Sequence, residues 1–112
     1  DIISSDIHCL SVDGPAFDLL TTINKIMTLG VSQVDAIKAA TQTPARAIFK
    51  GSLGRIRVGD TANISVLKPD TAENIYVDAV GEKISSTNAL RAAALVAKGS
   101  LICCDRELAT MT

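Results

Sequence analysis

The chain has 112 residues, a length that suits one ordinary domain, and a balanced charge of 11 basic and 12 acidic residues. It has no basic stripe that would neutralise a row of phosphates, which argues against nucleic acid as a partner. Its apolar stretches are far shorter than the roughly 20 residues that cross a bilayer, which argues against a membrane partner. The mean hydropathy of +0.31 is high for so short a chain. It indicates either apolar faces that pack against something else or an alanine-rich core.

Cysteine usage and the first residues bear on the compartment and on completeness. The three cysteines, Cys9, Cys103 and Cys104, give no readable disulfide framework, because the count is odd and two of them are adjacent. Free thiols are typical of a reducing compartment, so we expect a cytoplasmic protein. The sequence begins at Asp1 without an initiator methionine or a signal-peptide pattern, which favours a piece of a longer protein.

The N-terminal half predicts one strand followed by two or three helices. Residues 2–8 begin with β-branched side chains and predict a short strand with polar residues at its end. A helix is predicted from Pro15, capped by Asp13 or Gly14 and ended by Gly30, since apolar residues recur on one face between them.

Two further helices are predicted before the middle of the chain. The run Ser32-Gln33-Val34-Asp35 resembles a capping box and predicts a helix to about Thr41. Pro44 then suits the first turn of a further short helix, which Gly51 would end.

From Gly51 onward the pattern changes to short strands. Two strands are predicted at residues 53–58 and 62–67, with a tight turn at Gly59-Asp60, and residues 68–70 are predicted as a loop. Another strand is predicted at residues 75–80, followed by a turn near Gly81. Residues 88–98 allow a helix or a strand, with a strand from Val96 through Ile102. A single leading strand has no neighbour to satisfy its backbone, so we expect neighbours from elsewhere.

Several motifs occur in a particular order along the chain. They are Ser5-Asp6-Ile7-His8, Gly14-Pro15-Ala16-Phe17-Asp18-Leu19, Asn24-Lys25, Leu29-Gly30, Ala39-Ala40-Thr41-Gln42-Thr43-Pro44-Ala45-Arg46-Ala47, and residues 54–67. Together they resemble the C-terminal part of an enzyme of the amidohydrolase superfamily, in its dihydroorotase-like and deacetylase branch. The resemblance runs from about Asp1 to Gly99. One departure is Ala62-Asn63, where the family pattern has Ala-Asp, and we expect it to affect packing more than chemistry.

The resemblance implies an α/β fold that is a fragment of a larger enzyme. It would hold the last β/α unit of a (β/α)8 TIM barrel plus the C-terminal part of an associated small β-sandwich. Residues 1–50 would form the final strand and helices of the metallo-dependent hydrolase barrel. Residues 51–104 would form the C-terminal strands of the composite β-sandwich, and residues 105–112 a tail. In barrel enzymes the site lies at the C-terminal ends of the strands.

The resemblance also implies a small set of site residues. Asp6 would be both the catalytic residue and a ligand of a divalent metal ion, which is expected to be zinc. In that role a carboxylate takes a proton from metal-bound water and delivers it to the leaving nitrogen. His8 lies on the same side of the strand, and with Gly14 and Pro15 it is a candidate substrate-binding residue. The remaining ligands of such a centre match no position in this chain.

The residues by themselves leave other interpretations open. Asp6 alone fits a solvated residue at a strand end more readily than a catalytic residue. His8 alone fits a structural histidine or a second metal ligand, and Lys25 fits a solvated charge on its helix.

Three functional hypotheses follow. The chain is part of a metal-dependent amidohydrolase or deacetylase that cleaves the C–N bond of a small-molecule amide or cyclic amide, incomplete and inactive without the rest of the barrel. Alternatively, it is a catalytically dead truncated module that forms a homo-oligomer or binds an intact relative through apolar surface. The third hypothesis is an unrelated small α+β domain.

Overall fold

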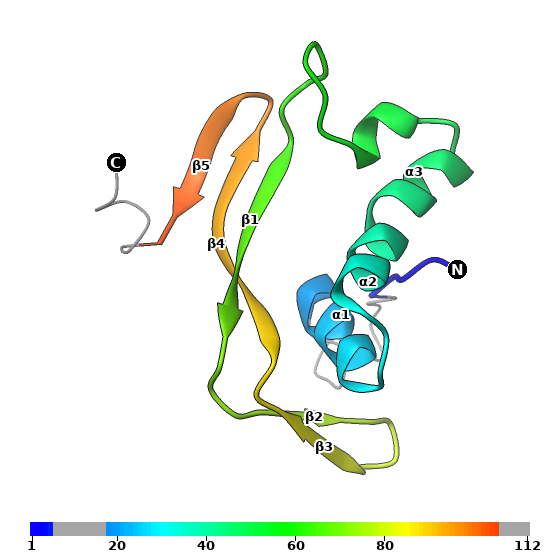
Figure 1. The fold of residues 1–112 in the computed structure, drawn as a ribbon, viewed down its shortest axis with the longest axis vertical. Coiled ribbons are helices and arrows are strands. Elements are labelled where there is room, and N and C mark those ends of the chain that lie inside the picture. The colour runs from blue at the N-terminus through cyan, green and yellow to red at the C-terminus, as the bar shows by residue number, and fades with distance from the viewer. Residues whose placement is uncertain (6–17, 106–112) are drawn as a thin grey trace.

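The computed structural model describes residues 1–5 and 18–105 of the chain. Helices form one layer and an antiparallel sheet forms the other, with a short two-stranded ribbon across one end (Figure 1). The helices are α1 (Leu19–Thr28), α2 (Gln33–Ala40), α3 (Gln42–Ala47) and the short 3-10 helix η1 (Gly51–Gly54). The strands are β1 (Ile64–Asp70), β2 (Asn74–Val77), β3 (Lys83–Ser86), β4 (Ala89–Ala97) and β5 (Ser100–Cys104). The order of helices first and strands afterwards agrees with the prediction.

The leading strand is not seen in the residues that the structure describes. Residues 1–5 have no regular secondary structure. The backbone N–H of Ile3 instead donates to the carbonyl oxygen of Ala39, at 2.9 Å, which attaches this segment to the end of α2. A strand needs a neighbour for its ladder, and none of the described strands lies beside this segment. The remainder of the predicted strand lies outside the described residues.

Helix α1 begins later than predicted. Its N-cap is Asp18 and not Asp13 or Gly14: the Asp18 carboxylate accepts the backbone N–H of Thr21 at 2.6 Å and its hydroxyl at 3.1 Å. The first bond gives the Thr21 backbone N–H a partner, which the first turn of a helix does not supply. Gly30 has a φ of +108°, so the predicted glycine end of the helix is confirmed.

The next two helices are close to the predicted ones. Ser32 caps α2 by accepting the backbone N–H of Asp35 at 3.2 Å, as the capping-box pattern predicts. Helix α3 starts two residues before Pro44, which is tolerated because backbone N–H groups of the first turn need no helical partner. The chain leaves α3 at Phe49, with a φ of +58°, rather than at Gly51, which opens η1.

Helix η1 packs against the junction of α2 and α3 through Gly54. A Cβ atom at this position would lie 2.4 Å from the carbonyl oxygen of Thr41 and 2.8 Å from the Cβ of Ala45. Only glycine permits this close backbone approach. The predicted strand at residues 53–58 is therefore wrong: this segment belongs partly to η1 and continues as a loop. The turn at Gly59 is confirmed by its φ of +94°.

The three-stranded sheet has the order β1-β4-β5, with both pairs antiparallel. Strand β1 continues through Pro69 to Asp70, where a loop was predicted. Because β1 is an edge strand, Pro69 can belong to it without breaking a ladder on both sides. The ambiguous stretch at residues 88–98 is strand β4, paired with β1 from Ala89 opposite Asp70 to Val96 opposite Ile64.

The C-terminal turns shorten two predicted strands. Lys98 and Gly99 both have positive φ and separate β4 from β5, so the predicted continuous strand from Val96 to Ile102 is wrong. Strand β2 ends at Val77 instead of residue 80, and the turn near Gly81, with a φ of +86°, is confirmed.

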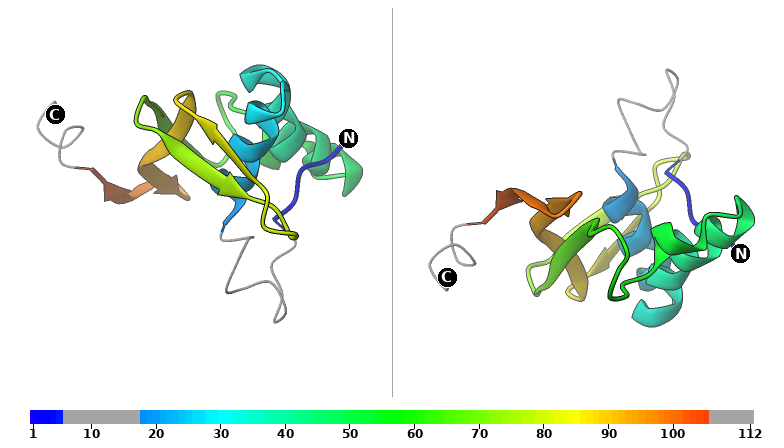
Figure 2. Two further views of the ribbon diagram at one scale, coloured as in Figure 1. Left: turned by 90° about the horizontal axis from the view of Figure 1, so that it is seen from below. Right: turned by 90° about the horizontal axis from the view of Figure 1, so that it is seen from above.

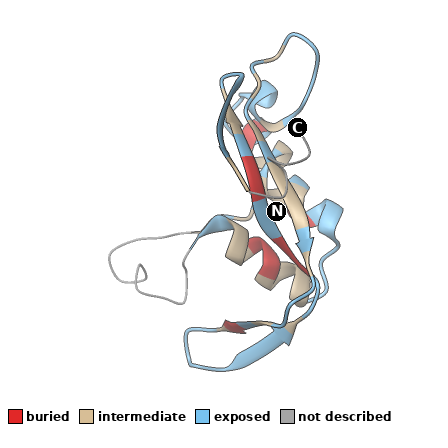
Figure 3. Cartoon of the chain, turned by 90° about the vertical axis from the view of Figure 1, so that its left-hand side faces the viewer, coloured by how far each residue is buried: buried red, intermediate tan, exposed pale blue. Residues whose placement is uncertain are grey.

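The core is small and consists largely of alanine. Alanines supply five of its eight apolar residues, and no large side chain among the described residues is completely buried (Figure 3). The core residues are Ile23, Ala36, Ala45, Tyr76, Ala89, Leu90, Ala93 and Ala94. The accessible surface is 8,077 Å², whereas a compact monomer of this mass exposes roughly 5,900 Å². The alanine-rich core is therefore confirmed, and large apolar side chains also stay exposed.

Among the described residues, no helix is long and apolar enough to cross a membrane.

Candidate functional site

The four predicted site residues, Asp6, His8, Gly14 and Pro15, lie outside the described residues, and so does Cys9. The structure describes what stands on either side of them. Before them, the chain is bonded to the end of α2 through Ile3. After them, α1 begins at Leu19, immediately after its N-cap residue Asp18.

No group of three or more His, Cys, Asp or Glu side chains that would hold a metal ion occurs within residues 1–5 and 18–105. The only histidine of the chain is His8, outside these ranges. A metal centre needs three or four protein ligands. The described residues alone therefore do not fit a metal centre.

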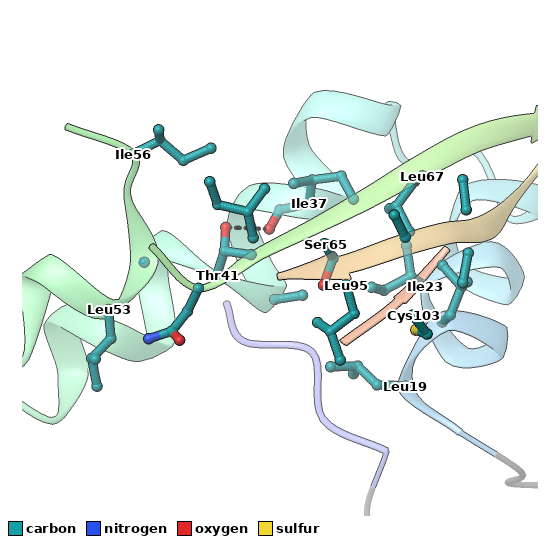
Figure 4. A pocket seen from close by; sticks show the side chains of 18 of the residues that line it. Leu19, Ile23, Ile37, Thr41, Leu53, Ile56, Ser65, Leu67, Leu95 and Cys103 are labelled. Atoms are coloured by element: carbon teal, nitrogen blue, oxygen red, sulfur yellow. Dashed lines mark hydrogen bonds between the residues drawn. The ribbon is translucent and has the colours of Figure 1, made fainter. Parts of the chain in front are cut away.

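A groove of about 950 Å³ opens between the helices and the three-stranded sheet (Figure 4). Its lining is mainly apolar and comes from α1, α2, η1 and all three strands of the sheet. Residues that line it include Leu19, Ile23, Ile37, Leu67, Leu95 and Cys103. The two layers lie side by side in the views along and across the sheet, with helices on one face only (Figure 2).

The polar groups in the groove are few. The Thr41 hydroxyl donates to the carbonyl oxygen of Ile37 at 2.7 Å, inside its own helix, and is drawn with that bond in Figure 4. Asp105 lies at the groove and pairs with Lys68, with 2.6 Å between Nζ and Oδ2. The groove is therefore lined mainly by apolar side chains and offers few polar groups for acid–base chemistry.

One buried amide joins the helical layer to the sheet. The side chain of Asn24, on α1, donates from Nδ2 to the carbonyl oxygen of Leu90 at 2.8 Å. It also accepts the backbone N–H of Leu90 at Oδ1, at 2.9 Å. Both backbone groups of one β4 residue are thus satisfied by a single side chain, as a neighbouring strand would satisfy them. We call this pair of bonds the Asn24 clamp.

A second bond from the same helix reaches the two-stranded ribbon. The ammonium group of Lys25 donates to the carbonyl oxygen of Val77, on β2, at 3.1 Å. The interpretation of Lys25 as a solvated charge is therefore wrong. In the sequence, Asn24-Lys25 was visible only as part of a motif, because polar residues on a helix give no sign of a strand that lies 50 or more positions later.

The departure from the family pattern at Asn63 has a structural role. The Asn63 side-chain oxygen accepts the backbone N–H of Lys98 at 2.9 Å, in the turn between β4 and β5. The neighbouring Ala62 carbonyl accepts the N–H of Gly99 at 2.9 Å. An aspartate offers the same oxygen acceptor, so the exchange of Asp for Asn preserves this turn contact.

Within the part of the chain that the structure describes, three side chains have a shifted pKa, and each shift has a local cause. The guanidinium of Arg55, 2.8 Å from Asp60, lowers the pKa of that carboxyl and has its own pKa raised by the same hydrogen bond. Burial raises the pKa of Tyr76. Arg55 and Asp60 lie at a surface turn and Tyr76 lies in the β2–β3 ribbon, so the three groups form no cluster for acid–base catalysis.

Comparison with known proteins adds sequence and fold relatives. No family model matches the chain. It is 31% identical over 88 residues to a deacetylase of Brucella anthropi, covering 79% of this chain and 22% of that protein. It is 30% identical over 80 residues to a deacetylase of Agrobacterium fabrum, covering 71% of this chain and 20% of the relative. A deacetylase of Enterococcus faecalis is 28% identical over 80 residues, or 70% of this chain and 22% of that one.

Two solved structures share the fold. A dihydroorotase matches with a TM-score of 0.78 and 25% identity, over 87% of this chain and 27% of its own. An adenine deaminase matches with a TM-score of 0.74 and 22% identity, over 80% of this chain and 24% of its own. The chain thus spans between a fifth and just over a quarter of the proteins it matches. The resemblance inferred from the motifs is confirmed: this chain is related in sequence to deacetylases and in fold to enzymes of the amidohydrolase superfamily.

Proposed function

We propose that this chain is part of a metal-dependent hydrolase that cleaves a C–N bond in a small-molecule amide or cyclic amide. The observation that carries the proposal is the match to deacetylases over most of the chain, at 28–31% identity. The mixed α/β fold, similar to that of a dihydroorotase and an adenine deaminase, supports it.

Asp6 is the residue to which we assign the chemistry. A bound divalent metal ion, for which zinc is the expected metal, would lower the pKa of a water ligand towards neutrality. Asp6 would hold that water, accept its proton during attack on the amide carbon and return the proton to the leaving nitrogen. His8, Gly14 and Pro15 would contact the substrate on the same side.

The proposed site needs polypeptide beyond this chain. No metal-holding cluster occurs among the described residues, and Asp6 with His8 gives at most two ligands. On the resemblance of the motifs, we assign residues 1–50 to the end of a hydrolase barrel and residues 51–104 to an associated sandwich. The rest of the barrel would supply the other ligands. We expect the 112-residue chain alone to show no hydrolase activity.

A chimera tests this proposal. Residues 1–112 would replace the matching segment of the Brucella anthropi deacetylase, aligned on the 88 matched residues. We expect the chimera to bind metal and to retain deacetylase activity that a chelator abolishes, whereas the isolated chain has neither property. A folded, metal-loaded chimera without activity would contradict the proposal, and so would metal-dependent hydrolysis by the isolated chain. Circular dichroism and metal analysis would establish folding and loading.

A further inference from the structure

The backbone of Leu90, on β4, is bonded by a side chain of α1. Pro69 stands opposite Leu90 on β1 and has no N–H to donate. On the other side, the pairing of β5 with β4 extends from Ala94 to Ala97 and does not reach Leu90. The Asn24 side chain, which is only 6% exposed, donates to the Leu90 carbonyl oxygen and accepts its N–H. Asn24 thus completes β4 at a position where the paired strands do not.

The neighbouring residue of α1 is bonded to the other sheet. Lys25 donates from its ammonium group to the carbonyl oxygen of Val77, on β2, at 3.1 Å. Adjacent residues of an α-helix point about 100° apart around its axis. Bonds from Asn24 and Lys25 to two different sheets therefore set both where α1 lies and how it is rotated about that axis.

The segment that contains the four predicted site residues is attached to the helical layer at both ends. This segment comprises residues 6–17 and lies outside the described residues. Before it, the N–H of Ile3 is bonded to the carbonyl oxygen of Ala39 at the end of α2. After it, the Asp18 carboxylate caps α1 by accepting the N–H of Thr21. Whatever places α1 on the sheet therefore also places the point at which this segment ends.

Helix α1 connects that point to the Asn24 clamp without a break. Asp18 and Asn24 are six positions apart, which corresponds to roughly 9 Å along a helix axis. A helix of this length moves as one body, so a shift of α1 on β4 displaces its cap as well. Misplacing reacting groups by about 1 Å can lower a catalytic rate by about 10²-fold. A contact further along the helix can therefore control the rate.

We propose that Asn24 is a positioning residue for the proposed hydrolysis of a C–N bond, an inference that rests on the proposed function. It acts through α1: its two bonds to Leu90 fix the helix on the sheet, and the helix holds the end of the segment that contains Asp6. The sheet serves in this way as a support for the catalytic segment.

Steady-state kinetics of the chimera with the deacetylase test this role. Asn24→Ala removes both clamp bonds and should lower kcat by about tenfold or more, with metal content unchanged. The assay is run at a temperature at which circular dichroism shows the variant to be folded. A residue that contributes only to stability would lower the unfolding temperature and leave the kcat of the folded enzyme unchanged. Asn88→Ala, at an exposed position, is the matched control and should leave kcat unchanged.

Asn24→Asp gives a second readout, in which the clamp depends on pH. A protonated carboxyl has one O–H donor and one carbonyl acceptor, so it reproduces both bonds of the amide, whereas the carboxylate has no donor. Burial raises the pKa of a carboxyl group. The kcat of Asn24→Asp relative to the unsubstituted chimera should therefore rise as the pH is lowered, because protonation restores the clamp. The same ratio for Asn24→Ala should not change with pH.

The outcomes separate this inference from the proposed function. A folded, metal-loaded chimera that is inactive without any substitution contradicts both. An active chimera in which Asn24→Ala leaves kcat unchanged overturns the positioning role alone. The role is also overturned if the ratio for Asn24→Asp does not change with pH, because the two bonds would then not control the rate. That measurement decides the question even where Asn24→Ala does not fold.

Discussion

The two ends of the contact between helices and sheet are built in opposite ways. At one end, α1 is fixed to β4 by the Asn24 clamp and to β2 by Lys25, through hydrogen bonds to backbone groups. At the other end, α2 and η1 stand apart from β1, and the apolar groove of about 950 Å³, which α1, β4 and β5 also line, opens between the helices and the sheet. At the first end, polar groups of the helix and the strands have partners within the chain. At the second end, apolar side chains are exposed and have little to pack against.

The difference shows that the orientation of α1 on the sheet and the burial of apolar side chains between the two layers depend on different contacts. Hydrogen bonds to particular backbone atoms set where α1 lies on the sheet, because only one arrangement satisfies both groups of Leu90. Apolar packing elsewhere in the contact is incomplete, since protein interiors leave few voids of this size. The helical layer is therefore positioned by a few polar contacts, while the apolar groove beside it remains open.

The largest effect on this comparison is expected from breaking the Asn24 clamp. Asn24→Ala removes two hydrogen bonds and leaves the buried N–H and carbonyl of Leu90 without partners, so we expect unfolding to be easier by about 3 kcal/mol. Asn88→Ala, at an exposed position in the same chain, is the matched control and should change stability by less than about 0.5 kcal/mol. Urea titration of both variants measures the difference. Equal midpoints for the two variants would show that the clamp contributes nothing.

A smaller effect is expected at the turn between β4 and β5. Asn63→Ala removes the acceptor for the Lys98 N–H and should cost about 1 kcal/mol. Asn63→Asp keeps an oxygen in the same place and restores the family pattern, so its unfolding free energy should stay within about 0.5 kcal/mol of the unsubstituted chain. Thermal unfolding of both variants distinguishes them, and an equal loss in both would show that the side-chain oxygen does not matter.

The smallest effect is expected in the groove. Leu53 is 61% exposed, so Leu53→Ala in the isolated chain should cost less than about 0.5 kcal/mol. In the chimera with the deacetylase, where further polypeptide would fill the groove, the same change should cost about 2 kcal/mol or more. The two values come from chemical unfolding of each protein with and without the substitution. A small cost in both contexts would mean that the groove stays open.

Local signals in the sequence predicted several helix ends and turns correctly. The Ser32 cap, the ends at Gly30 and the turns at Gly59 and Gly81 depend on short-range chemistry that single residues carry. The strand expected at residues 53–58 failed because its alternating pattern says nothing about the close packing of Gly54 on α3, which draws the segment into a 3-10 turn. Residues 88–98 became a strand because β1 and β5 flank them, and that information lies elsewhere in the chain.

The candidate site likewise combines residues predicted from the sequence with a contact that the sequence could not predict. Asp6, His8, Gly14 and Pro15 came from a resemblance of motifs and stay predictions, since they lie outside the described residues. The Asn24 clamp, which the structure shows, could not be predicted, because its partner is 66 residues away and is a backbone group that any residue would present.

The most direct test of the proposed function compares two carboxylates in the chimera with the deacetylase. Asp6→Asn should leave metal content nearly unchanged and lower kcat by about 10² to 10⁴, the loss expected for a positioned acid–base group. Asp35→Asn makes the same chemical change on the exposed surface of α2 and should leave kcat unchanged. An unaltered kcat in the fully metal-loaded Asp6→Asn chimera would contradict the assignment of Asp6 and the function built on it.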